Sequence, residues 1–199
     1  MAAVNELIVR EYFEMLGYLV SQPRKSATSG KSRMPGEDID LLISNPRVKE
    51  DLIPEHVIWT SDDFSGVARA VVGVRGWHTD RFYMSTFEKT PEIFRFADSE
   101  SIRFASKFFG SDAIARILCL PRLPASGELK DKTIAALRAR GIHGVISFET
   151  ILSDLVSGID VRKNYERSDL LQVMRILKNY QFLSNGQMDL FSSRRRKAN

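Results

Sequence analysis

Three charged residues lie within or beside apolar runs, where a plain hydrophobic core would have apolar side chains. Asp40 interrupts the apolar run IDLLISN (39–45), Arg75 interrupts VARAVVGVRGW (67–77), and Glu6 lies near the start of an apolar helical pattern. Asp is disfavoured in strands, and burying an acid or a base alone is costly. Arg75 keeps its charge at any reachable pH, so it can bind phosphate or neutralise Asp40 but cannot act as a general base.

The elements around these residues alternate between helices and strands. Apolar spacing predicts a helix over 4–20, strands over 39–45 and 67–77, and a further strand over 56–60. The pattern continues with a helix over 91–109, a strand over 115–123, a helix over 128–141, a strand over 143–148, and helices over 148–158 and 168–183. Pro91 suits a first helical turn, Gly110 a C-terminal cap and Ser168 an N-cap. This order predicts an α/β fold with a central sheet and helices on both faces.

The strings ELIVREYFEMLGYLV, GEDIDLLISNP and AVVGVRGWH resemble the N-terminal half of the PD-(D/E)xK nuclease superfamily, which includes archaeal Holliday-junction resolvases. The resemblance covers residues 4–78. Glu6, eleven residues before Gly17-Tyr18, matches the family's helix acid, and Asp40 matches its metal-binding strand Asp. Gly73-Val74-Arg75 falls on the Glu-x-Lys element.

The resemblance implies a restriction-endonuclease-like fold, in which a central mixed sheet is flanked by helices. The core would span 1–120, an α/β and helical extension of the same domain 121–190, and a basic tail 191–199. The resemblance also implies Mg²⁺ on Asp40 and Glu6, with Asp40, Glu6 and Arg75 in the catalytic positions. Gly73 offers no ligand, so Mg²⁺ would be bound weakly.

These changes favour a degenerate site that binds nucleic acid without efficient hydrolysis. One alternative is an active Mg²⁺-dependent endonuclease in which Glu92, Glu100 or Asp38 replaces the missing acid. Another is that Arg75 only neutralises Asp40 in a structural ion pair. DNA is the partner that the resemblance implies, with other nucleic acids as an alternative. Phosphate contacts would come from Arg75 and from a basic loop that holds Arg24, Lys25, Lys31 and Arg33.

Several surface and aromatic features keep two interpretations each. The basic loop and the tail residues 194–197 would also be expected for solubility alone. Trp59, Trp77 and Tyr83 could stack on bases if exposed, although a Trp beside a strand usually belongs to a core. His78 follows Gly76-Trp77, but a lone His is more often a hydrogen-bonded surface residue than a base.

Composition excludes some classes of protein and leaves others open. The net charge of +4 is too small to identify a polyanionic partner by itself, and this favours a third hypothesis, a protein-interaction scaffold with no DNA role. A single Cys, Cys119, and three scattered His exclude an internal disulfide and a classical zinc module. No run approaches the ~20 apolar residues that span a bilayer, so a cytoplasmic protein is expected. The apolar final helix predicts either central burial or a homodimer interface.

Overall fold

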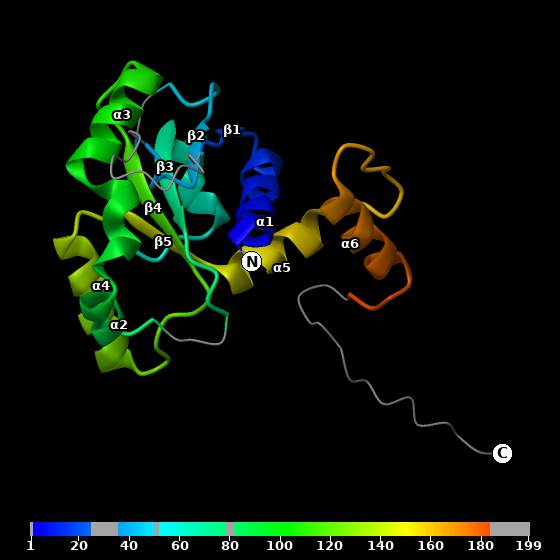
Figure 1. Cartoon of the computed structure of the whole chain (residues 1–199). Helices are drawn as coiled ribbons and strands as arrows, with labels where there is room; N and C mark the ends of the chain where they lie inside the picture. Colours follow the sequence, from blue (N-terminus) through cyan, green and yellow to red (C-terminus); the bar gives the residue numbers. More distant parts are fainter. Residues whose placement is uncertain (1, 25–35, 50–51, 79–81, 184–199) are drawn as a thin grey trace. The chain divides into compact units, whose positions relative to one another are not determined.

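The computed structural model of the chain describes residues 2–24, 36–49, 52–78 and 82–183 (Figure 1). Two compact units form, Met1–Ile151 and Leu152–Asn199. The first unit contains the sheet, and the second contains the C-terminal helices. In chain order the elements are α1 (Ala2–Met15), β1 (Leu19–Ser21), β2 (Leu41–Ser44), the 3₁₀ helix η1 (Ser61–Gly66), β3 (Arg69–Val74), α2 (Met84–Lys89), the 3₁₀ helix η2 (Pro91–Ala97), α3 (Ser99–Phe109), β4 (Ala115–Leu120), α4 (Gly127–Ala139), β5 (Gly144–Ser147), α5 (Phe148–Gly158) and α6 (Asp169–Asn179).

The five strands form one mixed sheet in the order β1-β2-β3-β4-β5. β1, β2 and β3 pair antiparallel, whereas β3, β4 and β5 pair parallel. Only β2 therefore runs opposite to the other four strands. The carboxyl ends of β1, β3, β4 and β5 lie at the same end of the sheet as the start of β2, and we call this the carboxyl end of the sheet. The prediction of an α/β fold with a mixed sheet flanked by helices is confirmed.

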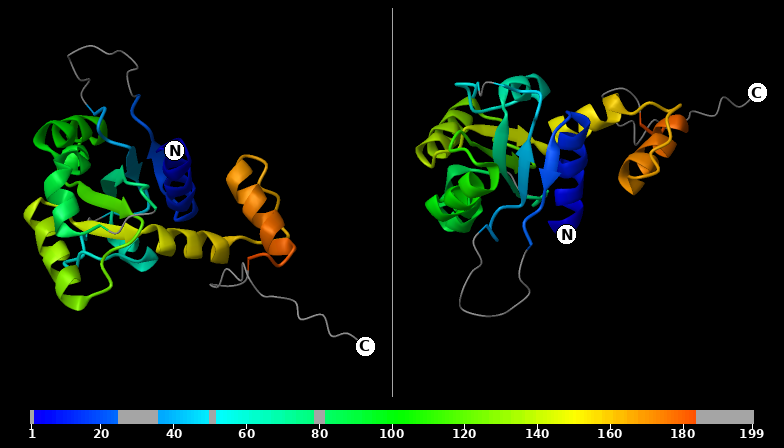
Figure 2. Two further views of the ribbon diagram at one scale, coloured as in Figure 1. Left: turned by 60° about the horizontal axis from the view of Figure 1, so that its bottom comes forward. Right: turned by 90° about the horizontal axis from the view of Figure 1, so that it is seen from above.

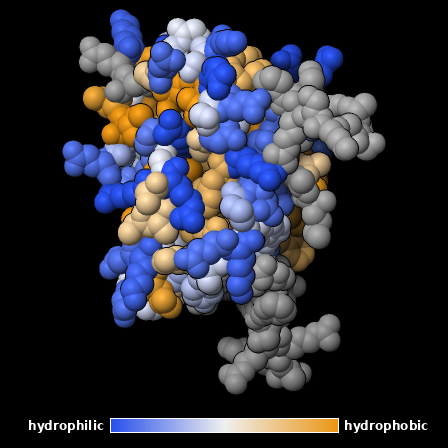
Figure 3. Space-filling model, turned by 60° about the vertical axis from the view of Figure 1, so that its left-hand side comes forward, coloured by the Kyte–Doolittle hydropathy of each residue, from blue (hydrophilic) through white to orange (hydrophobic). Residues whose placement is uncertain are grey.

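Helices cover both faces of the sheet, as Figure 2 shows. On one face, α1 packs against β1, β2 and β3, and an aromatic cluster joins it to η1 through edge-to-face contacts of Tyr12 and Phe13 with Phe64. On the other face, η2, α3 and their neighbours bury a core that includes Phe87, Phe96 and Leu118. Figure 3 shows the outer side of this helical layer as mainly hydrophilic, with smaller hydrophobic areas between the charged groups.

The N-terminal helix is shorter than the predicted range of 4–20. α1 ends at Met15, and Gly17 has a φ of +88°, a left-handed conformation that commonly ends a helix. The chain then turns into β1, and the hydroxyl of Tyr18 lies 2.7 Å from the carbonyl oxygen of Phe64 and 2.6 Å from that of Val67. The prediction that residues 19 and 20 are helical is therefore wrong.

Other boundaries differ from the predictions in smaller ways. The predicted strand over 56–60 is reduced to one isolated bridge between Ile58 and Val145. The predicted helix over 91–109 is divided at Asp98, whose carboxylate caps α3 by accepting a hydrogen bond from the Ser101 N–H (2.8 Å). The left-handed cap at Gly110 is confirmed. β5 pairs with β4, so part of the predicted extension 121–190 belongs to the same sheet.

Polar side chains of the second unit bind its backbone. Ser168 caps α6, as predicted, by accepting from the Leu171 N–H, and the Lys178 ammonium donates to the carbonyls of Val156 and Ile159. Met174 is the buried apolar residue of α6, whereas others on the helix are exposed by 37–53% (Val173, Ile176, Leu177). Central burial of the final helix stays a prediction. The homodimer interface stays a prediction.

The Asp40–Arg75 site and the carboxyl end of the sheet

Strand pairing places Asp40 next to the Gly73-Val74-Arg75 element. Leu41 pairs with Val72 in the antiparallel β2/β3 ladder, so Asp40, one residue before β2, lies opposite Gly73. Asp40 itself lies in a bend, and its N–H donates to the Val72 carbonyl (3.2 Å). These residues are 33 positions or more apart in the sequence, and the register alone brings them together.

Asp40 and Arg75 form a buried ion pair. Oδ2 of Asp40 accepts from Nη1 of Arg75 (2.6 Å) and from the Val74 N–H (2.8 Å), and the side chains are 8% and 15% exposed. The guanidinium also donates to the carbonyls of Val74 (2.9 Å) and Ile93 (2.8 Å). It lies 5.7 Å from the centre of the Phe96 ring. Arg75 therefore neutralises Asp40, as one of the interpretations predicts. Most of the N–H donors of its guanidinium bind groups of the protein itself.

The position of the missing acid is filled by an aromatic ring. A Cβ atom placed on Gly73 would lie 2.5 Å from Cδ1 of Phe96, which is fully buried. Gly73 and Arg75 do share one sheet face, as strand alternation predicts, since both contact η2. A carboxylate could not project from position 73 unless the Phe96 ring moved. Gly73 and Phe96 therefore form a packed part of the core at the place where the resemblance expects a metal ligand.

The other candidate acids have different surroundings. Glu6 lies in the second turn of α1 and accepts a hydrogen bond from Nε2 of Gln22 (3.1 Å). Asp38 lies in a turn before β2 and not in the strand itself. Glu92 on η2 and Glu100 on α3 are exposed. Among the candidate residues that the structure describes, the printed contacts join Asp40 to the Gly73-Val74-Arg75 element.

These donors do not fit a Mg²⁺ site. Mg²⁺ requires several oxygen ligands in near-octahedral geometry, whereas one oxygen of Asp40 already accepts from an arginine and a backbone N–H. Within the described ranges, no group of three or more His, Cys, Asp or Glu side chains could hold a metal ion. The arrangement is that of a structural ion pair.

The neighbouring strand brings Cys119 against this pair. The Arg75 N–H donates to the Cys119 carbonyl (3.0 Å), and the thiol is fully buried. Burial, followed by the negative charge of Asp40, raises the pKa of Cys119 far above its ordinary value. The thiol is therefore protonated and unreactive at neutral pH. Nothing in the sequence pattern connected Cys119 with Asp40.

The two Trp residues have opposite environments. Trp59 is 1% exposed and its Nε1 donates to the His56 carbonyl (2.8 Å), so it belongs to the core. Trp77, two residues after Arg75, is 43% exposed and stacks on the buried Phe82 ring with centres 5.6 Å apart and planes at 9°. Tyr83 is exposed by 37%. Trp77 thus presents a supported aromatic face near the carboxyl end of the sheet.

His78 has local partners, as a hydrogen-bonded surface residue would. Its Nε2 lies 2.9 Å from Oδ1 of Asn5 on α1, and its ring packs edge-on against Phe148, 4.8 Å between centres. Gly76 allows the close approach of Asn5, because a Cβ at Gly76 would lie 1.6 Å from Nδ2 of Asn5. The hydrogen bond between His78 and Asn5 joins α1 to the segment that follows β3.

The predicted basic loop is described only in part. Arg24 follows β1 at the carboxyl end of the sheet and is exposed. Lys25, Lys31 and Arg33 lie outside the described residues, as do tail residues 194–197. Sequence reasoning missed two further cations at the same end of the sheet, Arg122 after β4 and Lys130 on α4. Arg122 directly after a predicted strand, and Lys130 in the first turn of a predicted helix, were the sequence features that could have identified them.

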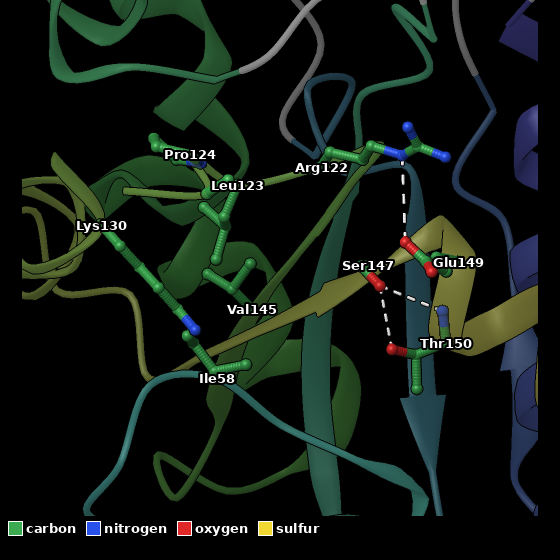
Figure 4. A pocket seen from close by; sticks show the side chains of 10 residues that line it. Ile58, Arg122, Leu123, Pro124, Lys130, Val145, Ser147, Glu149 and Thr150 are labelled. Atoms are coloured by element: carbon green, nitrogen blue, oxygen red, sulfur yellow. Dashed lines mark hydrogen bonds and ion pairs between the residues drawn. The ribbon is translucent and has the colours of Figure 1, made fainter. Parts of the chain in front are cut away.

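Arg122 and Lys130 line a pocket of about 430 Å³, shown in Figure 4. The pocket lies beyond the carboxyl ends of β4 and β5, where open α/β sheets commonly bind ligands. The loop between β4 and α4 forms one side, and the residues from the end of β5 to the start of α5 form another. The lining residues are Ile58, Arg122, Leu123, Pro124, Ala125, Lys130, Val145, Ser147, Glu149 and Thr150.

No family model matches this chain, and no curated protein and no solved structure matches it either. In the part of the chain that the structure describes, no helix is long and apolar enough to cross a membrane.

Proposed function

We propose that this chain has a restriction-endonuclease-like fold with an inactive catalytic centre, and that it binds nucleic acid without efficient hydrolysis. The observation that carries the proposal is the state of the Asp40 carboxylate. Arg75 and the Val74 N–H hold it, and Phe96 fills the space beside Gly73. Hydrolysis in this superfamily requires carboxylates that hold Mg²⁺ and activate water, and this donor set does not supply them.

The arrangement of the elements supports the fold assignment. The resemblance implies a helix, then a strand with the Asp, then a strand with the Glu-x-Lys element, followed by a helix and a further strand. The chain has α1, then Asp40 at the start of β2, Gly73–Arg75 at the end of β3, then α3 and β4. The Asp40 carboxylate contacts Val74 and Arg75 of the Glu-x-Lys position, and this closeness is what two metal ligands of an active enzyme would require.

The surface at the carboxyl end of the sheet supports nucleic-acid binding. Arg24, Arg122 and Lys130 provide cations for phosphates, which need only positive charge and donors. Trp77 offers an exposed ring that is held by Phe82 beneath it, and aromatic faces of this kind stack on unpaired bases. The chemistry of this surface therefore favours single-stranded or end-frayed nucleic acid over intact duplex.

The experiment measures cleavage and binding in the same samples. Labelled single-stranded, duplex and branched DNA is incubated with the full chain and Mg²⁺ or Mn²⁺, with Asp40→Asn as the comparison variant and circular dichroism as the test of folding. We expect no metal-dependent cleavage by either protein. We expect binding that weakens as salt rises, because phosphate contacts release counterions.

Two results would contradict the proposal. Metal-dependent cleavage by the unmodified chain that Asp40→Asn abolishes would mean an active endonuclease, with Glu92, Glu100 or Asp38 as the replacement acid. The absence of binding to any nucleic acid at low salt would instead favour a protein-interaction scaffold. Trp77→Ala removes the exposed ring and leaves the Asp40–Arg75 pair intact. A loss of binding in this variant would therefore be assigned to the ring and not to damage at the ion pair.

A further inference from the structure

The pocket at the ends of β4 and β5 is separate from the Asp40–Arg75 pair. It lies at the same end of the sheet, but its lining comes from the segment after β4, from α4, and from the junction of β5 and α5. Its volume, about 430 Å³, lies within the range of small-molecule sites, roughly 300–1,000 Å³. The pocket is therefore large enough for one small ligand or for the terminal residue of a polymer.

One wall of the pocket is apolar. Ile58 bridges Val145 of β5, and Leu123 and Pro124 come from the loop before α4. Figure 4 shows the side chains of Leu123, Val145 and Ile58 following one another along one side of the space. A wall of this kind accommodates a flat, weakly polar group such as a nucleobase.

Two cations, Lys130 and Arg122, give the pocket positive charge. The Lys130 side chain extends along the pocket toward Ile58 in Figure 4, and its ammonium has no hydrogen bond or ion pair within the described residues. Arg122 is 65% exposed and lies 3.9 Å from the Glu149 carboxylate, which is 75% exposed. A surface pair of this length contributes little stability, so Arg122 can turn to a bound anion at small cost. Ser147 adds a hydroxyl group, which hydrogen-bonds to the Thr150 side chain (2.9 Å).

We propose that this pocket binds the terminal phosphate of a nucleotide, with the base against the apolar wall. In Figure 4 the Lys130 ammonium lies beside Ile58 and the Arg122 guanidinium lies on the other side of the pocket, above Glu149. A phosphomonoester carries about −1.5 to −2 charges near pH 7, and each internal phosphodiester carries one, so a pocket with cations favours the terminal group. Glu149 is the opposing charge, and it reduces the net charge of the pocket to one positive. The ligand is either a free mononucleotide or the phosphorylated end of a strand. The second form rests on the proposed function.

The test compares ends and variants on the full chain. Fluorescence anisotropy measures the binding of one single-stranded sequence with a 5′-phosphate, a 3′-phosphate or hydroxyl ends, labelled away from the end that varies. Calorimetry measures the binding of adenosine 5′-monophosphate and adenosine. Lys130→Ala is the pocket variant. Lys132→Ala is the matched control, because Lys132 is on the same helix, is exposed, and pairs with Glu128 at 2.6 Å.

We expect one phosphorylated end, or the mononucleotide, to bind about tenfold more tightly than its unphosphorylated counterpart, equivalent to one well-placed charged contact. Lys130→Ala should remove that difference, Lys132→Ala should keep it, and Glu149→Gln should increase it. Mononucleotide binding that depends on Lys130, without strand binding, would support the pocket while the proposed function fails. Strand binding that is indifferent to every terminal phosphate, with no binding of the mononucleotide, would overturn the pocket proposal and leave the proposed function standing.

Discussion

The guanidinium of Arg75 lies 2.6 Å from the carboxylate of Asp40, and both side chains are almost completely buried. A buried ion pair of this kind is costly to break from one side, because the remaining charge has no partner. We therefore expect Arg75→Met to lower the free energy of unfolding by about 3–5 kcal/mol. The measurement is urea unfolding followed by circular dichroism.

The double variant Asp40→Asn/Arg75→Met is the control for that prediction. It removes both charges, and Asn can still accept the Val74 N–H, so its loss of stability should be smaller than that of Arg75→Met alone. Losses that simply add would show that the two charges do not stabilise each other.

A methyl group at Gly73 should destabilise the protein. The added Cβ would lie 2.5 Å from the Phe96 ring, and overpacking of a core costs about 1–3 kcal/mol. In a Phe96→Leu background the same substitution should cost less, because the ring is gone. Gly127→Ala is the control, since a Cβ there meets no atom within 4 Å. Equal effects of Gly73→Ala in both backgrounds would refute the packing explanation. The measurement is thermal and urea unfolding.

Trp77→Ala should weaken the binding of single-stranded nucleic acid. Stacking on an aromatic side chain contributes about 1–3 kcal/mol per base, equivalent to a loss of roughly five- to 150-fold in affinity. The control is Tyr180→Ala, which removes an aromatic ring that is 70% exposed on the second unit. Anisotropy titrations at two salt concentrations measure both variants. Unchanged affinity in Trp77→Ala would exclude the ring as a stacking surface.

His143 should make stability depend on pH in the weakly acidic range. Burial, and then the positive charge of Arg116, lower the pKa of His143, and Nδ1 accepts the Arg116 N–H at 3.1 Å. The folded state therefore favours the neutral ring. Its contribution to stability is complete above the ordinary His pKa of about 6.5, and it is lost as the pH falls through the lowered pKa of the folded state.

The measurement for His143 is the free energy of unfolding between about pH 5 and pH 7.5. His143→Asn keeps an acceptor for the Arg116 N–H but does not titrate, so the variant should lose less stability on acidification than the unmodified chain. The same pH dependence in both proteins would assign the effect to another group.

Local patterns in the sequence determined much of the fold. The apolar runs located β2 and β3, and alternation in an extended strand placed Gly73 and Arg75 on one face. The helix over 148–158 was predicted with the bounds of α5, and Ser168 was predicted as a cap. These features depend on residues within a few positions of one another, so their spacing is enough to predict them. The left-handed backbone of Gly17 is what ends the region of α1. The periodicity of the neighbouring residues does not report that angle, and it therefore predicted a helix that was too long.

The partners of the candidate residues were decided only by tertiary structure. Phe96 lies against Gly73 from 23 positions away in the sequence, and Arg75 meets Asp40 across the β2/β3 register. The same register and packing expose Trp77 and bury Trp59, although both follow apolar segments. The pocket of Arg122 and Lys130 exists because the parallel strands β4 and β5 end side by side. Contacts of this kind join distant segments, and their free energy depends on the whole fold.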